Sequence, residues 1–305
     1  MEREYRDRSG KLMTKEEAHM LPPQELTERS SMMVNILTDT DSLYEAIAEV
    51  MVQTILEKKG EKVTMILPVG PVGQYPVFAG KVRERDIDCH NLWTFNMDEF
   101  LSRNGKTISQ THPMSFKRIM MENFFNQIPE KLRMPIEQMF FPRHDNMDKI
   151  DRLFDEHAPD GVDLCLAGVG PEGHVAFNED PNFRHVEVSM EEFLADRTRL
   201  VMVNTSTVDM DALVAGCGDR SSIPPFAVTI GPHDILRAKR IEAIFYAGRF
   251  QRYALREVLF RAPTVHFPAT LLKLRKKEDG TVVPREDLTI WSTQQEAGIV
   301  QTQTI

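Results

Sequence analysis

The sequence predicts an α/β protein with a doubly wound, mostly parallel sheet and helices on both faces, a Rossmann-like arrangement. Two observations predict this fold class. Short apolar runs alternate along the chain with longer segments whose apolar residues recur at helical spacing. Several runs end in glycine-rich or acidic loops, where open α/β sheets bind their ligands. Because no linker-like stretch divides the chain, we expect one α/β domain over residues 34–272, an N-terminal extension over 1–33 and a C-terminal tail over 273–305.

The expected strands are short runs of β-branched, aromatic and other apolar residues. In chain order they cover residues 34–37, 63–67, 92–95, 164–167, 197–203, 226–231 and 241–248, with one more short strand within 135–145.

The expected helices repeat apolar residues at every third or fourth position. One of them opens with a capping box from Ser42 to Glu45 and ends at Gly60. The tail is polar and rich in Gln and Thr towards its end, so we expect no regular structure there. In chain order the helices cover residues 15–20, 42–58, 148–157, 234–238 and 249–260, with another that begins near Ser115.

The composition limits the classes of function. The chain has 305 residues, of which 41% are hydrophobic and 27% charged, and its formal net charge is −9. Nucleic acids and anionic membranes favour basic surfaces, so this balance argues against both as partners. There is no apolar signal core at the N-terminus and no run long enough to span a bilayer. Three cysteines without CxxC spacing fit free thiols in a cytoplasmic protein and argue against a metal site.

The loop after the run at residues 164–167 carries the strongest chemical signal. Three glycines follow within six residues, and glycine permits both a sharp turn and a close ligand approach. An imidazole flanked by two carboxylates at a strand end can transfer protons. A lone histidine in such a loop is more often structural, so the assignment needs support from elsewhere in the chain. The glycines are Gly168, Gly170 and Gly173, and the acid–base side chains are Glu172, His174 and Glu179.

Two further loops follow expected strands. Asp98 and Glu99 come directly after the run at 92–95, and taken alone they read more readily as a solvated acidic loop than as catalytic residues. The run at 63–67 leads into a glycine- and proline-rich turn before a helix, a junction where many α/β folds bind phosphate on backbone N–H groups. Val69, Gly70 and Gly73 of that turn are therefore candidate substrate-binding residues.

Residues 168–179, Gly-Val-Gly-Pro-Glu-Gly-His-Val-Ala-Phe-Asn-Glu, resemble the signature loop of the glucosamine-6-phosphate deaminase (isomerase) family. That signature reads approximately Gly-Val-Gly-x-Asp-Gly-His-Ile-Ala-Phe-Asn-Glu. Residues 96–100, Asn-Met-Asp-Glu-Phe, likewise resemble the family's Asn-Met-Asp-Glu-Tyr. The related 6-phosphogluconolactonases share the first part of the signature but lack Phe-Asn-Glu, so the chain resembles the deaminases more closely.

The resemblance implies a reaction and a set of roles. The family converts an amino-sugar phosphate into a ketose phosphate and ammonia, without a metal or organic cofactor, and homo-oligomers are common in it. By this resemblance His174 opens the sugar ring, with Glu172 and Glu179 orienting it, and Asp98 moves a proton between C1 and C2. Backbone N–H groups of the loop from Gly168 to Gly173 are expected to hold substrate oxygens.

Several positions depart from the family pattern. Glu172 stands in place of aspartate, and Val69 and Pro71 stand in place of a threonine and a glycine in the phosphate loop. Gln251 and Leu213 stand where the family has its phosphate-binding lysine and arginine. We therefore expect a divergent isomerase or deaminase acting on a sugar whose distal end is not a plain phosphate. Arg249 or Arg252 could substitute as the cation, and Arg252 is the candidate substrate-binding residue, although a solvated helix face explains both more readily. The alternatives are a 6-phosphogluconolactonase-like hydrolase and a non-catalytic sugar sensor.

Overall fold

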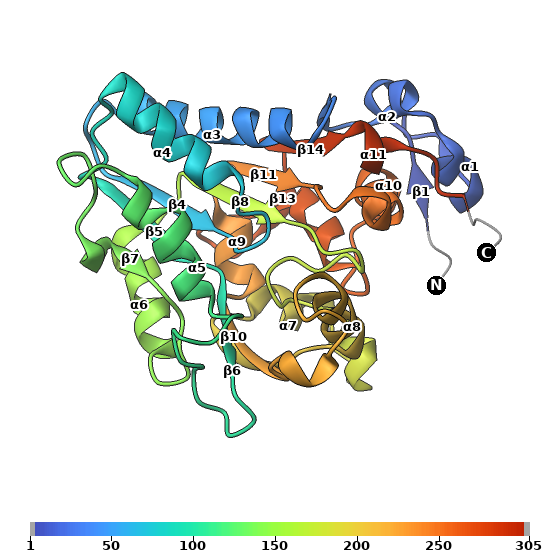
Figure 1. The fold of residues 1–305 in the computed structure, drawn as a ribbon. Helices are drawn as coiled ribbons and strands as arrows, with labels where there is room; N and C mark the ends of the chain where they lie inside the picture. The colour runs from blue at the N-terminus through green and yellow to red at the C-terminus, as the bar shows by residue number, and fades with distance from the viewer. Residues whose placement is uncertain (1–3, 302–305) are drawn as a thin grey trace.

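The computed structural model describes residues 4–301 and confirms the α/β fold class (Figure 1). Its centre is a seven-stranded sheet in which every neighbouring pair is parallel. The strand order is β3 (Met33–Leu37), β14 (Leu288–Thr293), β11 (Ile241–Ile244), β8 (Leu164–Gly168), β4 (Val63–Leu67), β5 (Leu92–Asn96) and β7 (Met139–Phe140).

Helices cover both faces of this sheet, as expected for a doubly wound fold (Figure 1). On one face α3 (Thr40–Glu57) and α4 (Gln74–Arg85) pack against β4, β5 and β8. On the other lie α6 (Met147–His157), α9 (Pro232–Arg237) and α10 (Arg252–Phe260). Helix α3 begins before the predicted Ser42 because the side chain of Asp39 accepts a hydrogen bond from the backbone N–H of Ser42 and caps the helix.

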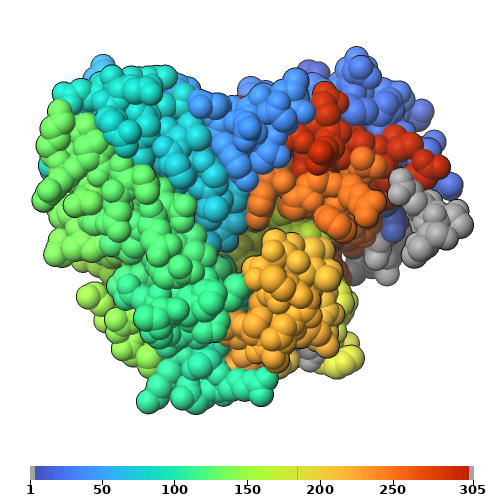
Figure 2. Space-filling view, in the orientation of Figure 1, coloured from blue at the N-terminus to red at the C-terminus, as the bar shows by residue number. Residues whose placement is uncertain are grey.

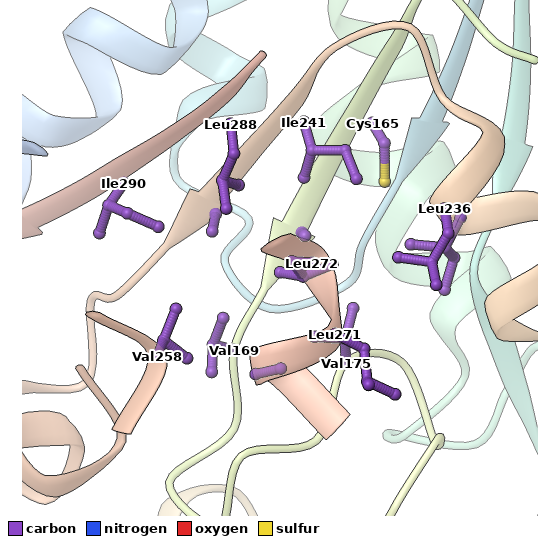
Figure 3. Packing of buried hydrophobic residues seen from close by; sticks show 14 of the residues in the cluster. Cys165, Val169, Val175, Leu236, Ile241, Val258, Leu271, Leu272, Leu288 and Ile290 are labelled. Carbon is purple, nitrogen blue, oxygen red and sulfur yellow. The ribbon is translucent and has the colours of Figure 1, made fainter. Parts of the chain in front are cut away.

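Two clusters of buried apolar residues pack against the central sheet, one on each face. All five residues of β4 are buried, as a strand covered on both faces requires. Figure 3 shows how apolar side chains from β8, β11 and β14 meet those of α10 and of the short helix η6 (Pro268–Lys273).

The sheet reverses its winding direction between β4 and β8. The chain runs outward from β4 to β5 and β7 on one side, and from β8 to β11 and β14 on the other. The carboxyl ends of such neighbouring strands open a crevice that commonly binds ligands. Here the loops after the two strands touch, because a Cβ on Gly168 would lie 1.9 Å from the carbonyl oxygen of Gly70.

A separate three-stranded antiparallel sheet lies beside the main one. It contains β6 (Asp98–Leu101), β10 (Phe226–Thr229) and β9 (Arg199–Met202), in that order. The runs at 197–203 and 226–231 are thus strands, but not of the parallel sheet. Asp98 begins β6 instead of lying in a loop, so the backbone of the neighbouring strand β10 fixes its position.

The expected C-terminal tail requires correction, because the region contains a strand of the central sheet. β14 lies between β3 and β11, with Leu288 and Ile290 buried and the half-buried Thr289 between them. This strand leads into α11 (Gln294–Ala297), and β12 (Leu274–Lys276) and β13 (Val282–Pro284) form a hairpin before it. The strand was missed because its polar residues suggested exposure to solvent. In the structure Thr293 is buried, and its N–H and hydroxyl groups both donate to the carboxylate of Glu296.

The N-terminal extension is also ordered. It folds into β1 (Tyr5–Arg6), β2 (Leu12–Met13), α1 (Lys15–Met20) and α2 (Pro23–Arg29). The extension packs on α10, where the hydroxyl of Tyr5 donates a hydrogen bond of 2.5 Å to Glu257. The buried guanidinium of Arg256, also on α10, donates to the carbonyl oxygens of His19, Leu21 and Ala297 and so links both ends of the chain.

The remaining elements are short. They are the helices α5 (Phe116–Asn123), α7 (Met190–Ala195) and α8 (Thr205–Val214), and the 3-10 turns η1 (Phe125–Gln127), η2 (Ile136–Gln138), η3 (Pro181–Arg184), η4 (Arg220–Ser222) and η5 (Gly248–Gln251). Among residues 4–301, no helix combines the length and apolar character needed to cross a membrane.

Candidate active site

A pocket of about 360 Å³ opens at the carboxyl ends of β4, β8 and β11. Its remaining walls come from the start of β6, from α8 and from the turn η5. Figure 2 shows this recess between the blue-green segment that holds α4, the orange segment that holds η5 and the gold segment that holds α8. The pocket therefore lies at the reversal point of the sheet, and Asp98 and His174 both line it.

Asp98 presents a carboxylate to the pocket from a rigid position. The residue is 6% exposed, and its side chain makes no hydrogen bond or ion pair with any residue between 4 and 301. Burial raises the pKa of Asp98 to about 8, and the nearby Glu99 and Asp211 carboxylates add to the rise while His174 opposes it. A carboxyl group with a pKa near neutrality can both accept and return a proton.

His174, which lines the pocket, pairs with Glu172, which lies outside the lining. Nδ1 of His174 lies 3.4 Å from Oε2 of Glu172, although neither atom has an aligned hydrogen bond to a described residue. Burial opposes the charge on both side chains, but their pairing outweighs it, so the pKa of His174 is raised and the pKa of Glu172 is lowered. Gly170 is required here, since a Cβ on it would lie 2.1 Å from the imidazole.

Gly173 positions the same loop from behind. It has a φ of +83°, and a Cβ there would lie 2.2 Å from the ring of Phe267. Its carbonyl oxygen accepts a hydrogen bond of 2.7 Å from the N–H of Ala269. Gly168 and Gly170 line the pocket, whereas Gly173 does not. Its predicted contact with substrate thus gains no support from its position.

Two of the acids singled out in the sequence cap helices. The carboxylate of Glu99 accepts hydrogen bonds from the N–H groups of Phe116 and Lys117 at the start of α5. The carboxylate of Glu179 accepts from the N–H of Asn204 at 2.9 Å and from the hydroxyl of Thr207 at 2.6 Å, at the start of α8. Glu179 does not line the pocket, but its charge still contributes to the raised pKa of His174.

Asp211 lines the pocket from α8 and was missed in the sequence. Its side chain is half-buried and makes no hydrogen bond or ion pair with a described residue. Burial raises the pKa of Asp211 to about 6; His174 lowers it, while Glu172 and Glu179 raise it further. A single acid within a helix reads as solvated, so only the placement of α8 over the pocket reveals this group.

The distal end of the pocket is built from apolar and uncharged groups. Val69, Gly70, Tyr246 and Phe250 line it, and among the described lining residues there is no lysine or arginine. Gly73 stands behind the lining against the ring of Tyr44, where a Cβ would lie 2.1 Å from the nearest ring carbon.

The backbone N–H groups at this end already have partners. Oε1 of Gln251 accepts from the N–H of Tyr246 at 2.6 Å and of Ala247 at 2.7 Å. Oε1 of Glu296, from α11, accepts from the N–H of Gly248 at 2.5 Å. Three donors at the start of η5 that could otherwise bind an anion are therefore occupied by the protein's own side chains.

Arg252, the predicted substitute cation, points elsewhere. Its guanidinium donates to the carbonyl oxygens of Gln295 and Ile299 and does not line the pocket. Arg249 lies over the ring of Phe250, 5.5 Å from its centroid, and is also outside the lining. Leu213 is 71% exposed on α8. The substrate-binding prediction for Arg252 therefore gains no support from the geometry.

Among residues 4–301, no cluster of three or more His, Cys, Asp or Glu side chains has an arrangement that could hold a metal ion.

Comparisons with known proteins agree with the resemblance seen in the sequence. The glucosamine-6-phosphate deaminase of Thermoanaerobacter sp. (strain X514) is 26% identical over 268 residues, which cover 84% of this chain and 97% of that protein. The deaminase of Caenorhabditis elegans is 26% identical over 85% of this chain and 91% of its own length. The predicted resemblance to glucosamine-6-phosphate deaminases is confirmed. No protein-family profile matches the chain.

Solved structures of deaminases and lactonases share the fold of this chain. A monomeric glucosamine-6-phosphate deaminase superposes with a TM-score of 0.71 at 24% identity, covering 87% of this chain and 99% of that one. The 6-phosphogluconolactonase from Leishmania guyanensis superposes with a TM-score of 0.59 at 16% identity, covering 89% and 99%. Deaminase and lactonase structures thus share the fold, and the difference between them must be sought in the pocket.

Proposed function

We propose that the protein is an amino-sugar isomerase and deaminase that converts a 2-amino aldose into a ketose and ammonia by acid–base catalysis. The observation that carries the proposal is that Asp98 and His174 line the same pocket, at the point where the sheet reverses direction. Relatives that align with most of the chain are named glucosamine-6-phosphate deaminases, which supports an enzyme of this type.

Ring opening is the first step of the proposed reaction. The anomeric hydroxyl loses a proton and the ring oxygen gains one, which breaks the C1–O5 bond and frees the C1 aldehyde. His174 is suited to carry that proton, since its pKa is raised from the ordinary histidine value by the nearby acids despite burial. Glu172, 3.4 Å away, favours the protonated imidazole.

Asp98 is suited to the second step. As a carboxylate it removes the proton from C2, so that a C1–C2 double bond forms and the carbonyl oxygen takes up a proton. The same group then returns its proton to C1, which leaves a C=N bond at C2. Water adds to C2, ammonia leaves and a ketone remains, so one water is consumed for each ammonia released. A pKa near 8 in a buried site suits a group that must both take and give this proton.

The distal end of the substrate is proposed to carry no phosphate. The support is the absence of lysine and arginine among the described lining residues and the internal occupation of the N–H groups at η5. A lactonase acting on a phosphorylated acid sugar meets the same difficulty, so the geometry favours it less.

The proposal is tested by incubating the purified protein with 2-amino aldoses, with and without a 6-phosphate, and measuring ammonia and ketose together. We expect ammonia and ketose in equal amounts, and product formation about 10²- to 10⁴-fold slower with Asp98→Asn. Hydrolysis of 6-phosphogluconolactone without ammonia release would instead establish the lactonase, and sugar binding without any turnover would establish a sensor.

A further inference from the structure

We propose that the pocket selects a positively charged amino sugar without a phosphate, and that Asp211 pairs with the substrate's ammonium group. For the reaction, this inference rests on the proposed function. For binding, it rests on the charges and contacts that line the pocket.

The first support is a pair of carboxylates without protein partners. Asp98 and Asp211 line the same pocket, and neither side chain makes a hydrogen bond or ion pair with a residue between 4 and 301. Asp98 is also 94% buried, since its exposed fraction is 6%. Buried polar groups nearly always have hydrogen-bond partners, so the buried Asp98 and the half-buried Asp211, which face the same space, indicate a ligand that supplies donors to both.

The second support is the sign of the charge around the pocket. Glu172 and Glu179 act electrostatically on His174 and on Asp211, and Asp211 itself lines the pocket. His174 is the only basic side chain among the described lining residues. A lined cleft with this imbalance concentrates cations and repels a phosphate dianion.

The third support is that the protein itself fills the place where an anion would bind. The N–H groups of Tyr246, Ala247 and Gly248 donate to Gln251 and Glu296. A carboxylate is already bonded at the start of this turn, so a substrate phosphate would have to displace Glu296 and then lie close to its charge.

Asp211 is assigned to the ammonium group because of where it stands. It lines the pocket together with His174 and Tyr246, and its charge acts on both side chains. In the proposed mechanism Asp98 transfers the proton from C2 to C1, so it is not assigned to bind the amine. The amine sits on C2, next to that proton, and an aspartate on the facing helix can accept hydrogen bonds from it while the chemistry proceeds at Asp98.

The experiment measures binding by calorimetry with ligands that cannot react. 2-Amino-1,5-anhydro-2-deoxyglucitol carries the amine but has no anomeric hydroxyl, so its ring cannot open. It is compared with 1,5-anhydroglucitol, which has a hydroxyl in place of the amine, and with the 6-phosphate of the amine. Asp211→Asn removes the charge with little change of shape. Asp209→Asn is the matched control, because Asp209 lies on the same helix but is exposed and pairs with Arg220.

We expect the wild type to bind the amine on the order of 10- to 100-fold more tightly than the hydroxyl analogue, the range of a charge-assisted hydrogen bond. Asp211→Asn should lower this ratio by about tenfold or more and Asp209→Asn should leave it unchanged. Tighter binding of the phosphorylated amine by the wild type, or an unchanged ratio in Asp211→Asn, would overturn the inference. Because these ligands do not react, a failure here is separate from a failure to release ammonia, which concerns the proposed function alone.

Discussion

The two ends of the pocket differ in how far they keep the features of the deaminase family that the sequence resembles. At the proton-transfer end, Asp98 and His174 face one space, and Gly170 leaves room for the imidazole. At the distal end, Val69 and Gln251 occupy positions where phosphate-binding groups were expected. The difference suggests that the reaction and the recognition of the far end of the substrate are separable on this fold.

The physical basis of that separation is the way each end is built. Asp98 belongs to β6 and is held by pairing with β10, so the sheet sets its position. The distal end depends on the N–H groups that begin η5, and any nearby acceptor side chain can occupy these. A few substitutions can therefore occupy the N–H groups at η5 without moving the carboxyl group of Asp98.

The largest expected effect comes from the proton-transfer end. Replacing Asp98 with Asn should lower the rate of ammonia release by about 10²- to 10⁴-fold, because a general base is lost while the shape is kept. The check is a steady-state assay, with calorimetry of the unreactive amine to show that binding persists. A variant that retains more than a tenth of the wild-type rate would contradict the assigned role of Asp98.

Glu172→Gln should have a smaller effect with a characteristic pH signature. Without the carboxylate that favours the imidazolium, the pKa of His174 should fall. The limb of the pH profile of kcat/KM that reports His174 should move to lower pH, and an NMR titration of the His174 ring should show the same shift. If neither the limb nor the ring titration moves, then Glu172 does not tune His174.

A test at the distal end is Gln251→Lys, which introduces a cation and frees the N–H groups of Tyr246 and Ala247. We expect the ratio of affinities for the phosphorylated and unphosphorylated unreactive amines to rise about tenfold, at a cost of about 1–3 kcal/mol in stability from the lost buried hydrogen bonds. Calorimetry and thermal melting check the two effects. A folded variant with an unchanged affinity ratio would show that the distal end is not limited by its missing cation.

The pH dependence of stability should also reveal the cost of ionising the buried carboxyl group of Asp98. The folded protein keeps a proton on Asp98 up to about pH 8, whereas an unfolded chain loses it near the ordinary value of 3.8. The unfolded state thus binds fewer protons in this window, so the wild type loses stability as pH rises from about 3.8 through about 8. Asp98→Asn cannot ionise and should melt a few degrees higher than the wild type at pH 8. The difference should shrink towards pH 4, and a constant difference would exclude this cause.

The residues whose place in the pocket could be predicted from the sequence are those that directly follow a strand of the central sheet. The strands at β4, β5 and β8 were visible as apolar runs, and the loops after them placed Asp98 and His174 at one edge of the sheet. Two parts were missed for physical reasons. β14 has too many polar residues to read as a strand, and Asp211 looks like any acid on a helix until α8 is seen over the pocket.

Other features depend on contacts between distant residues and so could not be predicted from local patterns. Glu179 was expected beside the imidazole, but its hydrogen bonds cap α8. In the sequence Gln251 stood out only because the family has a lysine at this position. Its hydrogen bonds to the N–H groups of Tyr246 and Ala247 could be seen only in the structure. Glu296 joins the same end from a region that was expected to have no structure.

The most direct test of the account is a comparison of kcat/KM for ammonia release from glucosamine and from glucosamine 6-phosphate, with Asp98→Asn as the control. The account predicts release from both or from glucosamine alone, a higher kcat/KM for the unphosphorylated sugar, and loss of both activities in the variant. A kcat/KM at least tenfold higher for glucosamine 6-phosphate would contradict it, as would release of ammonia that does not depend on Asp98.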